Sequence, residues 1–267
     1  MKEIDLIVFG GQSNMQGQSD CLSDTAVVDG AWEFRMLDDA FVPLKNPVGE
    51  DIRYDGGRGY CYTNGCDGSD WRNSHVLGSA CYGHTNLVPS FCAAYHATSG
   101  ADVIAVHAAK GSTVLAKWMP GTDGYAMLVK KAKAAIQKAE AEGFTIRHKA
   151  IVWLQGESDA LVSTSREAYK AMLTDLNNAL KRELGIETFG VIRIGYFGEL
   201  EKCKVILAAQ DEICEENPDF VMLTTLGTEL CGQPKYMNPN VGGHFGAAGL
   251  ELLGAVSGKR LAETFQK

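Results

Sequence analysis

Short apolar runs alternate along the chain with longer segments of helical periodicity, and this order constrains the fold more than any other feature. The short runs are rich in β-branched residues, as buried strands are, and they cover residues 4–9, 103–107, 150–154, 190–194 and 220–223. The longer segments carry apolar residues at three- and four-residue spacing, which predicts helices at 89–98, 124–142, 165–184, 202–216 and 246–264. The alternation predicts an α/β fold in which a five-stranded parallel sheet is covered by helices on both faces.

Residues 16–88 interrupt this pattern. The stretch contains Gly, Asp and Tyr residues with little periodicity, and it is too long to be an ordinary connection in a compact domain. We expect a single domain over residues 1–267, in which 16–88 forms an elaborated loop region over one end of the sheet. Ligands of such sheets bind beyond the carboxyl ends of the strands, so the functional site is expected there.

Charge and hydropathy exclude several classes of partner. The chain has 33 acidic and 25 basic residues, a formal net charge of -8, and no cluster of Lys and Arg that would bind a nucleic acid backbone. The apolar run at 4–9 is too short to span a membrane and lacks the charge order of a signal peptide. We therefore expect a cytoplasmic protein, or an exported one if a leader has been removed.

The eight cysteines are expected to be reduced thiols, because no export signal accompanies them. Cys61 and Cys66 form the only closely spaced pair, and neither a second pair nor a His doublet completes the ligand set of a zinc site. No metal site is predicted.

A serine stands where the first predicted strand ends. The strand leads into the segment GGQSNMQG, residues 10–17, which places Ser13 in a turn with its hydroxyl and backbone N–H exposed. The segment differs from the nucleophile elbow of α/β-hydrolases, because Met15 stands where that motif has glycine. Taken alone, such a serine is more typical of a turn or a helix cap than of a nucleophile.

The third predicted strand is followed by a cluster of polar residues, Gln155, Glu157, Ser158 and Asp159. Parallel strands end at the same edge of a sheet, so the cluster is expected near the carboxyl end of the first strand. Gln155 could donate a hydrogen bond to a developing oxyanion, and Glu157 or Asp159 could orient an imidazole. The alternative is that Ser158 and Asp159 cap the helix that follows.

Among the histidines, His244 is the best placed to act as a general base. It stands at or just before the start of the last predicted helix, and a helix N-terminus disfavours the imidazolium form. The neutral ring can then accept a proton. His107 falls in a predicted strand and is expected to be packed, and the other four histidines lack a comparable setting.

Taken together, these segments resemble the SGNH hydrolases and, within them, the sialate O-acetylesterase and acetylxylan esterase branch. The resemblance is carried by GQSNM at 11–15, by WLQGESD at 153–159 and by the segment around His244, and 109–118 is similar to that branch's Gly-Gly-Thr segment followed by Trp. It implies a flavodoxin-like three-layer α/β/α sandwich, the SGNH hydrolase fold. It also implies a serine esterase that removes O-acetyl groups from a sugar or oligosaccharide and needs no cofactor.

The resemblance assigns roles to individual residues. It implies that Ser13 is the nucleophile that carries the acetyl group and that His244 is the base. It further implies oxyanion or substrate binding by a second set of residues, Gln12, Asn14, Gly111, Gln155 and Asp159.

Two positions depart from the pattern of that branch. Many relatives carry Asp three residues before the histidine, where this chain has Val241. In relatives the Glu of the Gln-Gly-Glu segment is a triad member, so Glu157 is the first candidate to orient the imidazole, Asp159 the second and a Ser–His dyad the third. The oxyanion glycine of the superfamily has no clear equivalent within 83–89, where Asn86 and Val88 stand near its position.

Three other functions are weighed against this one. A lipase- or thioesterase-like relative would need an apolar acyl groove, whereas the 16–88 stretch offers aromatic residues that suit stacking on a sugar, namely Trp32, Tyr54, Tyr60, Tyr62 and Trp71. A carbohydrate-binding protein impaired in catalysis at Val241 is the second alternative. A nucleotide or flavin binder is not supported, because the glycines at 10–11 form neither a phosphate loop nor a Gly-x-Gly-x-x-Gly turn.

Overall fold

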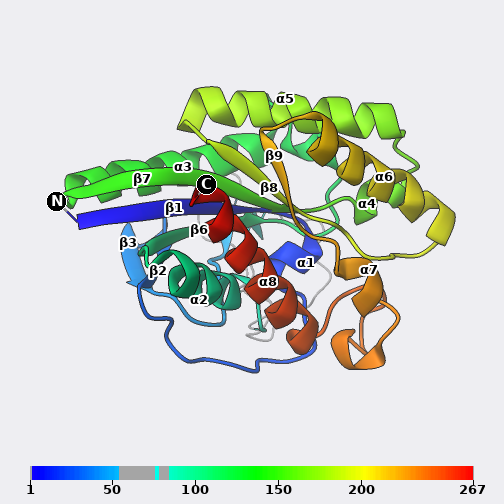
Figure 1. Ribbon diagram of the computed structural model, residues 1–267, viewed down its shortest axis with the longest axis horizontal. Coiled ribbons are helices and arrows are strands. Elements are labelled where there is room, and N and C mark those ends of the chain that lie inside the picture. The colour runs from blue at the N-terminus through cyan, green and yellow to red at the C-terminus, as the bar shows by residue number, and fades with distance from the viewer. Residues whose placement is uncertain (1, 54–75, 78–83, 267) are drawn as a thin grey trace.

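The computed structural model describes residues 2–53, 76–77 and 84–266, and a central sheet lies between two layers of helices (Figure 1). The sheet has seven strands in the order β3-β2-β6-β1-β7-β8-β9. Six of them are parallel, and five of these correspond to the predicted strands, namely β1 (Lys2–Gly11), β6 (Val103–Ala109), β7 (Phe144–Leu154), β8 (Thr188–Ile192) and β9 (Phe220–Thr224). Their order in space is that of a flavodoxin-like sheet.

The prediction of five strands was wrong, because the sheet continues past β6 into the stretch expected to be loop. β2 (Ala31–Arg35) pairs in parallel with β6, and β3 (Ala40–Pro43) pairs with β2 as an antiparallel hairpin. These strands are too short to show a clear period in the sequence. The same stretch contributes β4 (Ile52–Arg53) and β5 (Val76–Leu77), which form a separate two-stranded sheet.

Helices cover both faces of the sheet (Figure 1). On one face α2 (Val88–Ser99) packs against α8 (Ala247–Phe265), and the other face carries α3 (Asp123–Ala141), α5 (Arg166–Leu184) and α6 (Leu200–Glu216). These five helices begin and end within two residues of the predicted bounds. Shorter helical elements stand between them, namely α1 (Ser13–Gln16), α4 (Glu157–Leu161), α7 (Gly227–Leu230) and the 3₁₀ helices at Leu115–Trp118 and Pro234–Tyr236.

In the described part of the chain, no helix combines the length with the apolar composition that crossing a membrane requires.

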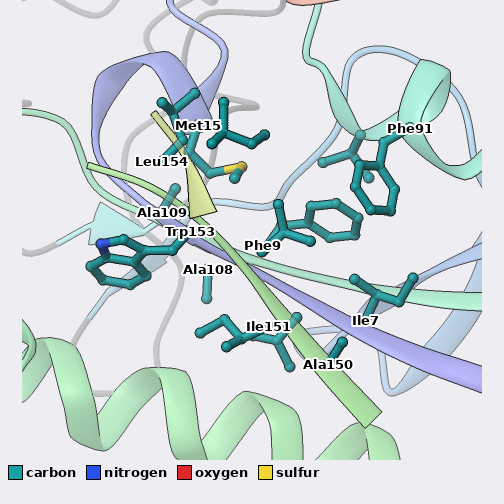
Figure 2. Close-up of a cluster of buried hydrophobic side chains, with 14 of the residues drawn as sticks. Ile7, Phe9, Met15, Phe91, Ala108, Ala109, Ala150, Ile151, Trp153 and Leu154 are labelled. Carbon is teal, nitrogen blue, oxygen red and sulfur yellow. The ribbon is translucent and has the colours of Figure 1, made fainter. Parts of the chain in front are cut away.

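The buried core anchors the end of β1. Ile7 and Phe9 are buried, and the ring of Phe9 meets that of Phe91 edge-on with centroids 5.1 Å apart. Figure 2 shows this ring pair within a cluster that also contains Met15 of α1. Because Met15 is fully buried, the short helix α1 is held in place by packing, and with it Ser13.

Candidate active site

Ser13 is the first residue of α1 and lies directly beyond the carboxyl end of β1. The turn requires glycine at position 11, where φ is 143° and a Cβ atom would lie 2.1 Å from the carbonyl oxygen of Leu154. The N–H of Gln12 donates to that same oxygen at 3.0 Å. Within the described residues, neither the hydroxyl nor the N–H of Ser13 has a hydrogen-bond partner, and the residue is 5% exposed. Its reactive atoms are therefore uncommitted.

His244 lies on the loop before α8, two residues ahead of the helix N-cap Gly246. Its Nδ1 is 3.0 Å from the carbonyl oxygen of Gly242, which can only accept, so Nδ1 carries the proton and Nε2 the lone pair. Burial lowers the pKa of the His244 imidazole below its ordinary value. The ring is therefore neutral at pH 7, and its basic nitrogen has no hydrogen-bond partner in the described part of the chain.

An aromatic ring supports the imidazole from the side. Phe197, in the loop after β8, meets the His244 ring edge-on with centroids 5.6 Å apart. Gly243 has a φ of 75°, and a Cβ atom there would lie 2.0 Å from the Phe197 ring. The glycine that precedes His244 thus allows the two rings to meet.

Asn14 connects the segment of Ser13 to the segment of His244. Its Oδ1 accepts from the N–H of Phe245 at 3.0 Å, and its Nδ2 donates to Oε1 of Glu157 at 2.7 Å. Asn14 follows Ser13 in the chain, and Phe245 follows His244. The hydrogen bond between these two neighbours therefore joins the serine segment to the histidine segment.

Two residues that the sequence analysis missed strengthen this connection. Nδ2 of Asn238 donates to the carbonyl of Gln18 at 3.0 Å, and its N–H donates to the carbonyl of His244 at 2.8 Å. The Oδ1 of Asp20 accepts from the N–H of Ala247 at 2.8 Å and so caps α8 from a distant segment. Sequence patterns give no signal for a cap that lies more than 200 positions away from its helix.

Glu157 makes a different contact from the one expected. The carboxylate is buried, it accepts from Asn14, and Oε2 has no partner among the described residues. Burial raises the pKa of the Glu157 carboxyl, and the Asn14 hydrogen bond opposes that rise. The Nδ1 of His244 meets Gly242 instead, so the direct orienting contact between Glu157 and His244 is absent from the structure.

Gln155 and Asp159 are bonded to each other and to the surrounding loops. The Nε2 of Gln155 lies 2.6 Å from Oδ2 of Asp159 and 3.0 Å from the carbonyl oxygen of Thr113. Asp159 also accepts from the N–H of Leu115 at 2.8 Å and from the hydroxyl of Thr164 at 3.0 Å. Both amide hydrogens of Gln155 are thus used, and the oxyanion role expected for Gln155 finds no support in this geometry. The substrate contact expected of Asp159 is equally unsupported, because both carboxylate oxygens are occupied.

Gln12 and Gly111 are likewise bonded within the protein. Oε1 of Gln12 accepts from the N–H of Ser158 at 3.1 Å, and the N–H of Gly111 donates to Oε1 of Gln16 at 2.8 Å. These contacts join the turns after β1, β6 and β7. The N–H of Gly111 therefore links two turns of the protein and does not take the oxyanion-binding role expected from the sequence.

The region expected to hold the oxyanion glycine is also occupied by internal contacts. The N–H of Asn86 donates to Oδ1 of Asn46 at 2.8 Å, and the N–H of Val88 donates to Oδ1 of Asn86 at 2.8 Å. Gly83 lies outside the described residues. Neither Asn86 nor Val88 therefore offers a backbone donor to a substrate.

Trp32 lies too far from Ser13 to stack on a substrate there. It pairs in β2 with Ile104, near the start of β6, and Nζ of Lys2 lies 4.7 Å from its ring centre. This position is at the amino end of the sheet, opposite to the site, because β2 and β6 run parallel. The other aromatic residues expected to contact sugar lie outside the described residues, namely Tyr54, Tyr60, Tyr62 and Trp71.

Over residues 2–53, 76–77 and 84–266, no group of three or more His, Cys, Asp or Glu side chains is arranged to hold a metal ion. The described cysteines are free thiols, namely Cys21, Cys92, Cys203, Cys214 and Cys231. Cys61, Cys66 and Cys81 lie outside the described residues.

Comparison with known proteins assigns the chain to a family. A family model described as carbohydrate esterase, sialic acid-specific acetylesterase, matches residues 3–266. A probable carbohydrate esterase of Arabidopsis thaliana is 26% identical over 123 residues, which are 44% of this chain and 45% of that protein. The match thus spans about half the length of this curated relative.

Solved structures share the fold at low sequence identity. The X-ray structure of the Arabidopsis thaliana protein has a TM-score of 0.64 at 18% identity and covers 97% of this chain and 98% of its own. The crystal structure of NanS has a TM-score of 0.64 at 14% identity, with 99% and 97% covered. A carbohydrate acetylesterase from Xanthomonas citri has a TM-score of 0.56 at 15% identity, with 97% and 57% covered. These likenesses confirm the predicted SGNH hydrolase fold.

Proposed function

The chain belongs to the carbohydrate esterase family of sialic acid-specific acetylesterases, and from this premise we propose that it hydrolyses O-acetyl esters on sugars through an acetyl-enzyme on Ser13. One observation carries the proposal. The segments that carry a serine and a neutral histidine, each with a reactive atom that has no partner among the described residues, are joined at the carboxyl end of the sheet by the Asn14–Phe245 hydrogen bond.

The reaction proceeds by two acyl transfers. Nε2 of His244 takes the proton from Oγ of Ser13 as that oxygen attacks the ester carbonyl carbon, and the carbonyl electron pair moves to oxygen. The tetrahedral intermediate collapses, the bond to the sugar oxygen breaks, and that oxygen receives the proton from His244. Water then attacks the acetyl-enzyme with the same base, and acetate leaves with Ser13 restored.

Two backbone groups supply the electrostatic support that the reaction needs. The N–H of Ser13, which is uncommitted among the described residues, is the donor available to the oxyanion. The carbonyl of Gly242 accepts from Nδ1–H of His244 and so stabilises the imidazolium that forms in the transition state. The proposed machinery is therefore a Ser13–His244 dyad in which a backbone carbonyl stands where a triad has a carboxylate.

A panel of esters tests the proposed function. We expect acetate to be released from acetylated xylan fragments or acetylated sialic acid, and p-nitrophenyl esters to react more slowly as the acyl chain lengthens. Preference for long acyl chains would instead favour a lipase-like enzyme. Binding of acetylated sugar without release of acetate would favour a carbohydrate-binding protein.

A further inference from the structure

Glu157 is a buried carboxylate that the proposed dyad does not use. It is 1% exposed and stands at the start of α4, beyond the carboxyl end of β7. Removing such a group from water costs several kcal/mol unless it gains partners, yet only Oε1 has a hydrogen-bond partner within the described residues. That partner is the Nδ2 of Asn14, so the effect of Glu157 on the site has to be sought at Asn14.

The amide of Asn14 can adopt only one orientation between its neighbours. The N–H of Phe245 is a donor and requires Oδ1, while Oε1 of Glu157 is an acceptor and requires Nδ2. In the flipped orientation Nδ2 would face the N–H of Phe245, donor against donor, and Oδ1 would face Oε1 of Glu157, acceptor against acceptor. Glu157 therefore selects the orientation of Asn14 that binds the loop of His244.

We propose that Asn14 is a positioning residue that holds the His244 loop against the nucleophile turn, and that Glu157 acts on the reaction through Asn14 and not through the imidazole. This inference rests on the proposed function of Ser13 and His244.

The contacts of the peptide that follows His244 determine how firmly this base is held. The carbonyl of His244 accepts from the N–H of Asn238, and the next peptide N–H, that of Phe245, donates to Asn14. The peptide that follows His244 is thus bound on both sides. Loss of the Asn14 contact frees one side, and a displacement of about 1 Å at a reacting group can cost about a hundredfold in rate.

An exchange of donor and acceptor between the two residues tests the proposal. Asn14→Asp keeps the acceptor for Phe245 but places an oxygen against Oε1 of Glu157, and we expect kcat to fall about a hundredfold with KM within about twofold. Glu157→Gln keeps an oxygen acceptor for Asn14, so we expect a loss of less than about tenfold. In the double variant the amide of residue 157 donates to the carboxylate of residue 14. We expect kcat to recover to within about tenfold of the original enzyme.

Two readouts separate this role from direct action of Glu157 on the imidazole and from loss of folding. The pH at which kcat/KM falls on the acid side should be the same in the original enzyme and in Glu157→Gln, because the carboxylate does not contact the imidazole. Thr164→Val serves as the control, since Thr164 bonds Asp159 on the far side of α4, and its kcat should stay within about twofold. Thermal unfolding of every variant shows whether it is folded.

The proposal is overturned if the double variant is no better than Asn14→Asp, or if Glu157→Gln alone abolishes turnover and shifts the acid limb. The second result would mean that the carboxylate acts directly on His244. Failure of the proposed function would look different, because the original enzyme would then release no acetate from any ester of the panel.

Discussion

The turns after β1 and β7 lie side by side at the carboxyl edge of the sheet, yet Ser13 in the first turn and the pair Gln155 and Asp159 in the second are in opposite states. After β1, the hydroxyl and N–H of Ser13 have no partners within the described residues. After β7, Gln155 and Asp159 bind each other, and Asp159 binds two further loops. Polar residues in a candidate site thus divide into those without protein partners and those whose hydrogen bonds build the turn.

The substitution Ser13→Ala should have the largest effect on turnover, and it changes a residue whose hydroxyl and N–H have no partner among the described residues. It removes a hydroxyl without partners among the described residues, so stability should change by less than about 0.5 kcal/mol. Turnover should fall by about 10⁴-fold or more, because a nucleophile has no substitute. Initial rates on p-nitrophenyl acetate measure this, and a variant that keeps a tenth of the original rate would exclude Ser13 as nucleophile.

The substitution Asp159→Ala should instead have a large effect on stability and a smaller effect on turnover. Two buried donors, Nε2 of Gln155 and the N–H of Leu115, and the half-buried hydroxyl of Thr164 lose the carboxylate as an acceptor. We expect the free energy of unfolding to fall by about 4 kcal/mol, and turnover per folded molecule to fall much less than in Ser13→Ala. Urea unfolding measures the free energy of unfolding, and initial rates divided by the concentration of folded protein measure the turnover. A stable variant without activity would instead give Asp159 a direct role in the reaction.

His107 offers a pH-dependent test of the packing beneath α1. Burial lowers its pKa from 6.5 to about 4, and its Nε2 lies 3.0 Å from the carbonyl oxygen of Met15. Between these pH values the unfolded chain binds a proton that the native state does not, so stability falls as the pH falls. The loss of unfolding free energy that His107 causes reaches about 3 kcal/mol at pH 4, and this loss should be absent in His107→Gln. Urea unfolding of both proteins from pH 7 to 4 would contradict this if the two curves ran parallel.

The smallest expected effect is a shift, toward lower pH, of the acid limb in the pH profile of kcat/KM. Because burial lowers the pKa of His244 below its ordinary value of 6.5, the base stays neutral to a lower pH than an exposed histidine would. The value of kcat/KM should therefore be constant near neutrality and fall only below about pH 6.5. A pH profile with p-nitrophenyl acetate measures this limb, and a midpoint above 7 would show that a different group is the base.

Patterns within short segments were sufficient to predict most of the fold, and they led to the prediction that Ser13 and His244 are functional. The five helices were placed within two residues, since burial of one face imposes a helical period on the sequence. The five central strands were found from their apolar, β-branched runs, although β7 begins six residues before the predicted strand. The edge strands β2 and β3 were missed, because a short hairpin has no such period. Ser13 and His244 could be placed from the sequence because each stands at a strand or helix end that local sequence defines, and their roles in the reaction stay predictions.

Partner choice among the loop side chains could not be predicted. Glu157 and Asp159 are two residues apart and have similar chemistry, yet one binds Asn14 and the other binds Gln155, Leu115 and Thr164. These choices depend on how turns from different strands pack together, which no single segment encodes. For the same reason, the acceptor of His244 is a backbone carbonyl that the sequence analysis did not consider.

Covalent labelling tests whether Ser13 is a nucleophile activated by His244. A fluorophosphonate should form one bond from phosphorus to Oγ of Ser13 with loss of fluoride, and peptide mass spectrometry locates the adduct. We expect labelling at Ser13 in the original enzyme, none at that peptide in Ser13→Ala, and labelling at least about a hundredfold slower in His244→Ala. An adduct on a different residue, or labelling of Ser13 at an unchanged rate without His244, would contradict the claim.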